Sequence, residues 1–170
     1  MAASNPLRKF VNRVNQYPQW LSSRLLTWMF RSKVKLAGTA KIDIIHTDGS
    51  SVTFRQRNIK KVQNHIGGVH AAGMVLLAES ATGFICGINL PGDKLPLVKS
   101  IETRFVRRSV GDMHATASLT EAQIASMKSD EKGSTTVTVV VTDDSGQQPI
   151  ECDIVWAWVP KKKKPVETAA

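Results

Sequence analysis

Residues 64–83, NHIGGVHAAGMVLLAESATG, decide the fold of this 170-residue chain. Between about Val69 and Gly87, Glu79 is the only clearly charged side chain, and small residues alternate with bulky ones. A helix that is apolar on nearly all sides must be buried on most of its faces, and small side chains allow a sheet to approach it closely. We therefore predict a long central helix at about residues 69–87, wrapped by a sheet.

The rest of the body has the alternating pattern of β-strands. A hairpin is predicted at residues 39–57, where apolar and polar residues alternate on both sides of a polar turn. A short helix capped by Thr120 is predicted among four later strands, at residues 97–106, 113–119, 134–142 and 150–159. A mostly antiparallel sheet curled around one helix satisfies this order, which indicates the α+β class.

Size and charge distribution predict one domain with two basic ends. A chain of 18.6 kDa can bury one core. The net charge is +9, but residues 1–42 contribute +8 and residues 161–170 contribute +3, so the body at 43–160 is slightly acidic, with a charge of −2. We divide the chain into an N-terminal helical extension (1–36), a sheet-and-helix domain (37–160) and a basic, disordered tail (161–170). With no recognition element in the basic ends, we expect no nucleic-acid partner.

The extension has the pattern of two amphipathic helices separated by Pro18. Asn5 and Pro6 are typical of a helix start. Three interpretations stay open. The helices cover the apolar surface of the domain, residues 6–35 make a weak contact with an anionic membrane surface, or the segment is a transit peptide.

The residues around the start of the central helix are the best candidates for chemistry. Asn64, His65 and His70 flank two glycines at a helix start, where free backbone N–H groups would stabilise a developing oxyanion. Glu79 follows about two and a half turns later, and a lone carboxylate on an apolar helix should have a raised pKa. Structural roles stay equally open: Glu79 could pair with an arginine such as Arg104, and His70 could cap the helix.

Other kinds of site are not indicated by the sequence. The four histidines lack zinc-ligand spacing, and Gly67-Gly68 does not match a phosphate-binding loop, so we expect neither a metal nor a cofactor. Cys86 and Cys152 have apolar neighbours and are interpreted as reduced thiols. Together with the lack of a secretory signal, they predict a cytoplasmic protein.

These motifs resemble the hotdog-fold thioesterase superfamily, most closely its DUF4442 branch, which is similar to the phenylacetate-pathway type of acyl-CoA thioesterase. In that type an Asn lies six positions before a His, and an acidic residue lies nine positions after it. Asn64, His70 and Glu79 match this spacing. IETRFVRRSVGD at 101–112 and MHATASL at 113–119 also resemble the family, and the likeness spans nearly the whole chain.

The resemblance implies a hotdog fold that hydrolyses acyl-CoA or acyl-carrier thioesters, with acyl-CoA as substrate rather than cofactor. The implied catalytic residues are Glu79 as general base or nucleophile, Asn64 to orient water or carbonyl, and His70 to position the substrate. The implied oxyanion and substrate-binding residues are Gly68, Ala71 and Ala72. The expected assembly is a homodimer or a dimer of dimers, with Asn64 and Glu79 meeting across the interface.

The resemblance also suggests where the rest of the substrate binds. Arg104, Arg107 and Arg108 are candidates for the phosphates of coenzyme A, although a basic strand edge can also serve only to discourage aggregation. The acyl pocket is predicted at Met74, Leu77 and Phe84, with tryptophans as further candidates, although such side chains can also simply belong to the core.

One departure from the thioesterase pattern keeps other functions open. Ala71-Ala72 stands where those enzymes usually have Gly-Gly, so two methyl groups narrow the approach to the backbone N–H groups. This favours a non-catalytic acyl-CoA or lipid-binding protein as one alternative. A hydratase or dehydratase that uses a His and an acid on the same fold is the other.

Overall fold

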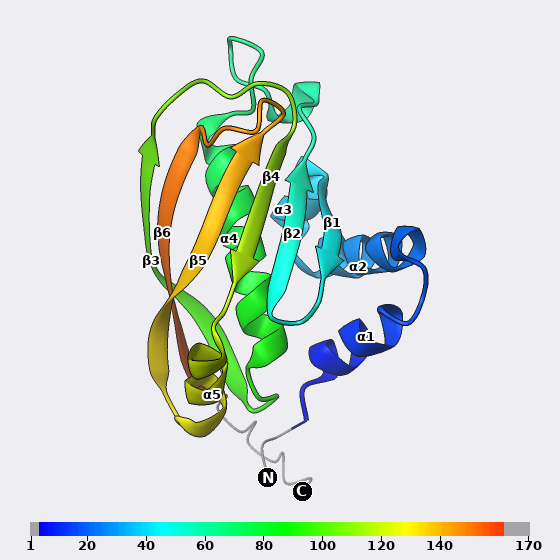
Figure 1. Ribbon diagram of the computed structural model, residues 1–170, viewed down its shortest axis with the longest axis vertical. Helices are drawn as coiled ribbons and strands as arrows, with labels where there is room; N and C mark the ends of the chain where they lie inside the picture. Colours follow the sequence, from blue (N-terminus) through cyan, green and yellow to red (C-terminus); the bar gives the residue numbers. More distant parts are fainter. Residues whose placement is uncertain (1–3, 162–170) are drawn as a thin grey trace, which may run out of the picture.

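The computed structural model describes residues 4–161 as a six-stranded sheet curled around one long helix (Figure 1). In chain order, the elements are α1 (Pro6–Val14), α2 (Gln19–Lys33), α3 (Lys35–Ala40), β1 (Ile42–Thr47), β2 (Ser51–Gln56), the 3-10 turn η1 (Lys60–Val62), α4 (Ala71–Asn89), β3 (Lys94–Phe105), β4 (Met113–Ser118), α5 (Glu121–Ser129), β5 (Gly133–Asp143) and β6 (Ile150–Pro160). Every neighbouring pair is antiparallel, in the order β1-β2-β4-β5-β6-β3. The predicted α+β architecture is confirmed.

Several boundaries differ from the prediction by one to three residues, among them the start of β3 at Lys94 and the end of α4 at Asn89, and two of the differences have a clear local cause. The central helix begins at Ala71 and not at 69, because His70 is its N-cap: the Nδ1 atom of His70 accepts a hydrogen bond from the Ala72 N–H at 3.1 Å. The hairpin begins at Ile42 and not at 39, because the preceding residues form α3, which ends where Lys41 adopts a left-handed conformation. Helix α3 therefore crosses the expected boundary between extension and domain. All of the expected tail beyond residue 161 lies outside the described residues.

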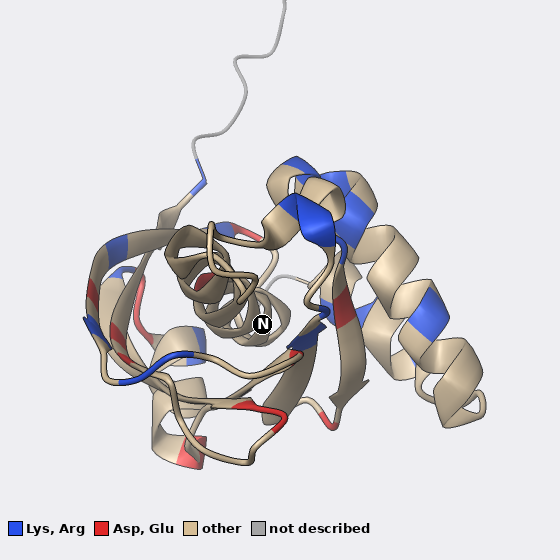
Figure 2. Ribbon diagram, turned by 90° about the horizontal axis from the view of Figure 1, so that it is seen from above, with Lys and Arg blue, Asp and Glu red and all other residues tan. Residues whose placement is uncertain are grey.

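Helix α4 forms the centre of the core. Figure 2 shows it enclosed by the curved sheet, and the side chains of Leu77, Ala81 and Ile85 are completely buried. By length and composition this helix could cross a membrane, with a mean hydropathy of 1.6 over its most apolar window. Because five strands pack along it, we assign it instead as the core helix of the domain.

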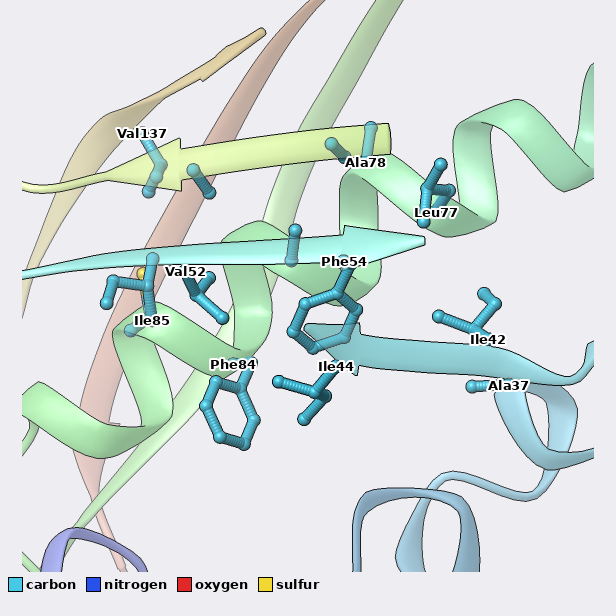
Figure 3. Close-up of a cluster of buried hydrophobic side chains, with 14 of the residues drawn as sticks. Ala37, Ile42, Ile44, Val52, Phe54, Leu77, Ala78, Phe84, Ile85 and Val137 are labelled. Atoms are coloured by element: carbon cyan, nitrogen blue, oxygen red, sulfur yellow. The ribbon is translucent and has the colours of Figure 1, made fainter. Parts of the chain in front are cut away.

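Three aromatic rings connect the N-terminal extension to this core. The ring of Phe30 on α2 contacts Phe54 on β2 edge to face, with centroids 5.0 Å apart, and Phe84 on α4 at 5.8 Å. Figure 3 shows Phe54 and Phe84 among the buried side chains of β1, β2 and α4. Offset and edge-to-face pairs add to the gain from burial, so α2 is packed as a part of the fold.

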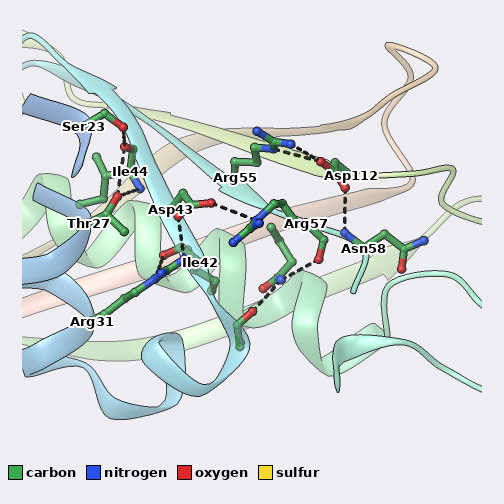
Figure 4. Close-up of polar contacts among 12 residues, drawn as sticks. Ser23, Thr27, Arg31, Ile42, Asp43, Ile44, Arg55, Arg57, Asn58 and Asp112 are labelled. Atoms are coloured by element: carbon green, nitrogen blue, oxygen red, sulfur yellow. Dashed lines mark hydrogen bonds and ion pairs between the residues drawn. The ribbon is translucent and has the colours of Figure 1, made fainter. Parts of the chain in front are cut away.

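Helix α2 covers one edge of the sheet (Figure 4). On the edge strand β1, the Ile44 carbonyl accepts a hydrogen bond from the Ser23 hydroxyl at 2.6 Å, and the Ile44 N–H donates to the Thr27 hydroxyl at 2.9 Å. The Arg31 guanidinium donates to the carbonyl of Ile42 at 2.8 Å. These side chains occupy backbone groups that would otherwise attract another strand.

The opposite edge, β3, has no such cover in the described chain. It is 12 residues long and pairs only with β6. Its exposed apolar side chains are Leu95, Leu97, Val98, Ile101 and Phe105. A long, apolar, open edge is a template for pairing with another strand.

Two carboxylates hold the loop between β3 and β4. Asp143 at the end of β5 accepts a hydrogen bond from the Arg107 guanidinium at 2.7 Å. Asp112 accepts from Arg55 on β2 at 2.6 Å and from the backbone N–H of Asn58 at 2.8 Å (Figure 4). The second set of bonds fixes the end of β2, from which the chain leads to the start of α4.

We expect the buried Asp143 carboxylate to stabilise the fold in a pH-dependent way. Burial raises its pKa, but the Ser145 hydroxyl, the Val110 N–H and the Arg107 guanidinium outweigh this effect and lower the pKa from 3.8 to about 2. This stability is present above pH 3.8 and is lost as the pH falls towards about 2. Asp143→Asn should lower the free energy of unfolding at pH 7 by about 2 kcal/mol.

Urea unfolding at neutral and acid pH measures this effect. The matched control is Asp153→Asn, because Asp153 is exposed and forms no ion pair within the described residues. An equal loss of stability in both variants would contradict the assignment.

Candidate active site

A cavity of about 540 Å³ lies between α4 and the N-terminal helices. Its volume is in the range of small-molecule sites, which are usually apolar with a few polar groups. Its apolar walls are formed by Pro6, Leu7, Phe10, Met29, Phe30, Val34, Gly83, Phe84, Gly87, Pro96 and Trp156. Three polar side chains also line it: Lys33, Glu79 and Ser80.

The sequence of α4 leaves room for this cavity. Glu79, Gly83 and Gly87 are spaced by four residues and therefore lie along one face of the helix. A Cβ atom on Gly83 would come within 2.7 Å of the Trp156 ring, and one on Gly87 would contact Leu7 at 3.5 Å. Larger side chains at positions 83 and 87 would occupy part of the cavity that these two glycines line.

Glu79 presents a carboxylate without a partner. Within residues 4–161 its carboxylate oxygens form no ion pair, and Arg104, a partner considered from the sequence, pairs instead with Glu151 across β3 and β6. Burial raises the pKa of Glu79, and the adjacent Ser80 hydroxyl opposes this shift. A half-buried carboxylate without an ion pair beside an apolar cavity indicates a place where a ligand or water binds.

The loop before α4 is held by Asn64. Its side-chain oxygen accepts hydrogen bonds from the backbone N–H groups of Ile66 at 3.0 Å and Gly68 at 3.1 Å. The backbone N–H of Asn64 donates to the Gly68 carbonyl at 2.8 Å. Gly67 has a φ of 81°, which glycine adopts without strain. The Asn64 oxygen is thus committed to the loop, and its NH₂ group is the part that can meet a substrate.

His70 occupies one of the two predicted oxyanion donors. The Ala72 N–H donates to the Nδ1 atom of His70. Ala71 is the first residue of α4, and its N–H has no partner among the described residues. A carbonyl oxygen at the start of α4 would therefore be bound by Ala71 rather than by Ala72.

Within one chain, the Glu79 carboxylate and the Ala71 N–H lie far apart. Ala71 and Glu79 are eight residues apart on the same helix, which corresponds to about 12 Å along its axis. Of the predicted catalytic residues, Glu79 lines the cavity, whereas Asn64 and His70 do not.

The arginines predicted for coenzyme A phosphates have different roles in the structure. Arg104 pairs with Glu151, and Arg107 pairs with Asp143 at 2.7 Å. Arg108 is exposed and forms no ion pair within the described chain. Only Arg108 is therefore free to meet a phosphate without breaking an existing pair.

The structure contains only part of the predicted acyl pocket, and Trp156 is the one tryptophan of the described chain that lines the cavity. Phe84 lines the cavity, whereas Met74 and Leu77 are buried in the core and do not. Most of the remaining wall comes from α1 and α2, which none of the interpretations of the extension placed at the pocket. The four-residue spacing of Glu79, Gly83 and Gly87 was the signal in the sequence that could have located this face.

We expect the unpartnered Glu79 carboxylate to destabilise the fold at neutral and higher pH. Its pKa in the folded state is raised above the ordinary value of 4.5, so the native state binds a proton that the unfolded chain releases. Stability therefore falls as the pH rises above 4.5. Glu79→Gln should remove this part of the pH dependence and raise the melting temperature at pH 8.

Thermal unfolding at pH 5 and pH 8 checks this. Glu131→Gln, which changes an exposed carboxylate, is the matched control and should behave as the wild type. If Glu79→Gln keeps the pH dependence of the wild type, the Glu79 carboxylate is solvated in the fold and the prediction is wrong.

Comparisons with known proteins agree with this architecture. The sequence model of the family described as "Domain of unknown function (DUF4442)" matches residues 22–159. No curated protein matches the chain. One similar solved structure is a Pseudomonas aeruginosa protein of unknown function, PA5026, described as a probable thioesterase. It has a TM-score of 0.73 and 20% identity, over 81% of this chain and 95% of that chain.

Two further structures are similar. A proposed thioesterase from Shewanella oneidensis has a TM-score of 0.69 at 10% identity, over 89% of this chain and 99% of that chain. A thioesterase from Haemophilus influenzae has a TM-score of 0.63 at 11% identity, over 88% of this chain and 95% of that chain. At such identities these matches show the fold and confirm the expected hotdog architecture. The match of the family model over most of the sequence shows that the chain belongs to the DUF4442 family.

Proposed function

We propose that this protein is a thioester hydrolase that acts on acyl-CoA or acyl-carrier substrates. One observation carries the proposal: the Glu79 carboxylate, unpartnered and with a pKa raised by burial, lines an apolar cavity of about 540 Å³. A base with a raised pKa is suited to proton transfer near neutral pH. Structures of the same fold that are named thioesterases support the reaction class.

The proposed mechanism uses the start of α4 and Glu79. The Ala71 N–H polarises the thioester carbonyl and stabilises the oxyanion. Glu79 removes a proton from water as the water oxygen attacks the carbonyl carbon. The C–S bond then breaks, and the products are the carboxylic acid and the free thiol. In the second version Glu79 attacks the carbonyl itself, expels the thiolate and forms a mixed anhydride that water hydrolyses.

Other residues hold the substrate in this proposal. The NH₂ group of Asn64 orients the water or the carbonyl, while His70 positions the helix start through its cap. Gly68 keeps this loop tight, because a Cβ atom there would come within 3.2 Å of the Ser109 hydroxyl. Arg108 is the phosphate-binding candidate that forms no ion pair in the described chain.

We infer that the complete site contains residues from two subunits. Because Ala71 and Glu79 are about 12 Å apart along one helix, the helix start of one protomer must approach the carboxylate of its partner. The open edge β3 offers the means, because antiparallel pairing of two copies would continue the sheet and bury its apolar side chains. This supports the expected homodimer, alone or within a dimer of dimers.

A non-catalytic acyl-CoA or lipid-binding protein is the second candidate. The observation that favours it is the hydrogen bond from Ala72 to His70, which leaves only the Ala71 N–H for the oxyanion. The hydratase alternative has no such support among the described residues, because the Nδ1 atom of His70 is already used as the cap of α4.

Release of free thiol from a panel of acyl-CoAs tests the reaction. We expect turnover by the wild type and a fall of about a hundredfold in kcat for Glu79→Gln, the scale for losing a general base. Glu131→Gln serves as the exposed control. Absence of turnover on every substrate, with acyl-CoA still bound, would contradict hydrolysis and favour the binding protein.

Mixed dimers test whether the site is shared between subunits. Ala71→Pro removes the proposed oxyanion N–H while keeping a residue that suits the first position of a helix. The extended backbone of His70 is compatible with a following proline. We expect both Ala71→Pro and Glu79→Gln homodimers to be nearly inactive.

Co-refolding the two variants should restore about a quarter of wild-type activity, because half of the dimers are mixed and each contains one intact site. No recovery in mixed dimers of demonstrated composition would contradict a shared site. Mixing each variant with itself is the control.

A further inference from the structure

The outer face of α2 carries exposed aromatic side chains. Trp20, Arg24 and Trp28 are four residues apart and lie on one side of the helix; we call these three residues the tryptophan face. Trp20 is 62% exposed and Trp28 is 71% exposed. Tyr17, in the turn before α2, is also exposed. Large rings left in water on a helix surface are typical of a surface that binds something.

The helices around this face are basic. Figure 2 shows blue and no red segments on the N-terminal helices, and the first 42 residues contain no acid. Arg8 and Arg31 are used within the fold, by Asn89 and Asp43 respectively. The bases that are exposed and form no ion pair within residues 4–161 are Lys9, Arg13, Arg24, Lys33, Lys35 and Lys41.

We propose that α1 and α2 dock this protein on an anionic lipid bilayer through the tryptophan face. Tryptophan combines a large apolar ring with one N–H donor and is enriched at the level of lipid headgroups. Arg24 lies 5.7 Å from the centroid of the Trp20 ring, so cation and ring are presented together. The opposite face of α2 packs on the core and the cavity, so the tryptophan face is the side of this helix that a membrane surface would meet.

Charge selects a bilayer over a second copy of the chain. Pairing two of these faces would bring two acid-free, basic segments together, and like charges in an interface oppose association. An anionic surface instead complements Arg24 on this face and the acid-free, basic character of the helices around it.

The inner face of the same helix strengthens the inference. Met29 and Phe30 line the apolar cavity, so α2 separates this cavity from the proposed bilayer. Docking would place the cavity beside a source of acyl chains. The docking itself rests on the exposed face and its charge, and it does not depend on the proposed hydrolysis.

Vesicle binding by the full chain tests the proposal. We expect sedimentation with phosphatidylcholine vesicles that contain phosphatidylglycerol, little with pure phosphatidylcholine, and weaker binding at high salt. Binding should also shift tryptophan fluorescence to the blue. Because Trp156 and Trp158 are already buried, the shift reports on Trp20 and Trp28.

Substitutions identify the face. The double variant Trp20→Ala/Trp28→Ala should lose both the binding and the fluorescence shift, and Arg24→Gln should weaken binding about fivefold. The matched controls are Val140→Ala and Lys132→Gln, which remove an exposed apolar side chain and an exposed base from elsewhere on the surface. Circular dichroism checks that each variant is folded.

Three results would overturn the proposal. One is failure of the wild type to bind anionic vesicles. Another is binding that the double variant retains in full. The third combines two observations: the wild type does not bind vesicles, and the double variant changes its oligomeric state or loses nucleic-acid binding. That result would assign the face to a different partner.

Discussion

Packing of α4 against the inner face of the sheet removes Leu77, Ala81 and Ile85 from water completely, and the other layers follow from it. A sheet can cover only part of a helix that is apolar nearly all round. The remaining face, which contains Glu79, Gly83 and Gly87, is left to α1 and α2. Those helices contact it without filling it, and the space between them is the cavity. The cavity is therefore a consequence of small residues on a helix that must be buried.

The two edges of the sheet differ in how they are covered. Ser23, Thr27 and Arg31 of α2 bind the exposed backbone of β1, so that edge cannot recruit a second copy. The β3 edge has no equivalent cover within residues 4–161 and exposes apolar side chains. Helix α2 thus protects one edge, forms a wall of the cavity and presents the tryptophan face to the outside.

The central helix and six strands could be predicted because hydrophobic periodicity is a local property. The predicted start of α4 was wrong by two residues, because hydrophobic periodicity does not distinguish a histidine N-cap from a residue inside the helix. Glu79 was identified as a lone charge, but the walls of its cavity come from α1 and α2, which only tertiary packing brings near. The pairing of Arg104 with Glu151 depends on the register between β3 and β6, and this register cannot be predicted from the composition of the two strands.

The replacement of Gly-Gly by Ala71-Ala72 has a clearer meaning once the helix start is described. Alanine is favoured over glycine within a helix by up to about 1 kcal/mol per residue, so the change strengthens the start of α4. The backbone donors are the same in either case, and one of them is occupied by His70. The Ala72 side chain is exposed in the single chain, and its methyl group therefore narrows the approach to the helix from outside. In the proposed mechanism the substitution would therefore affect which acyl groups can reach Ala71, and it would leave the charge stabilisation by the Ala71 N–H unchanged.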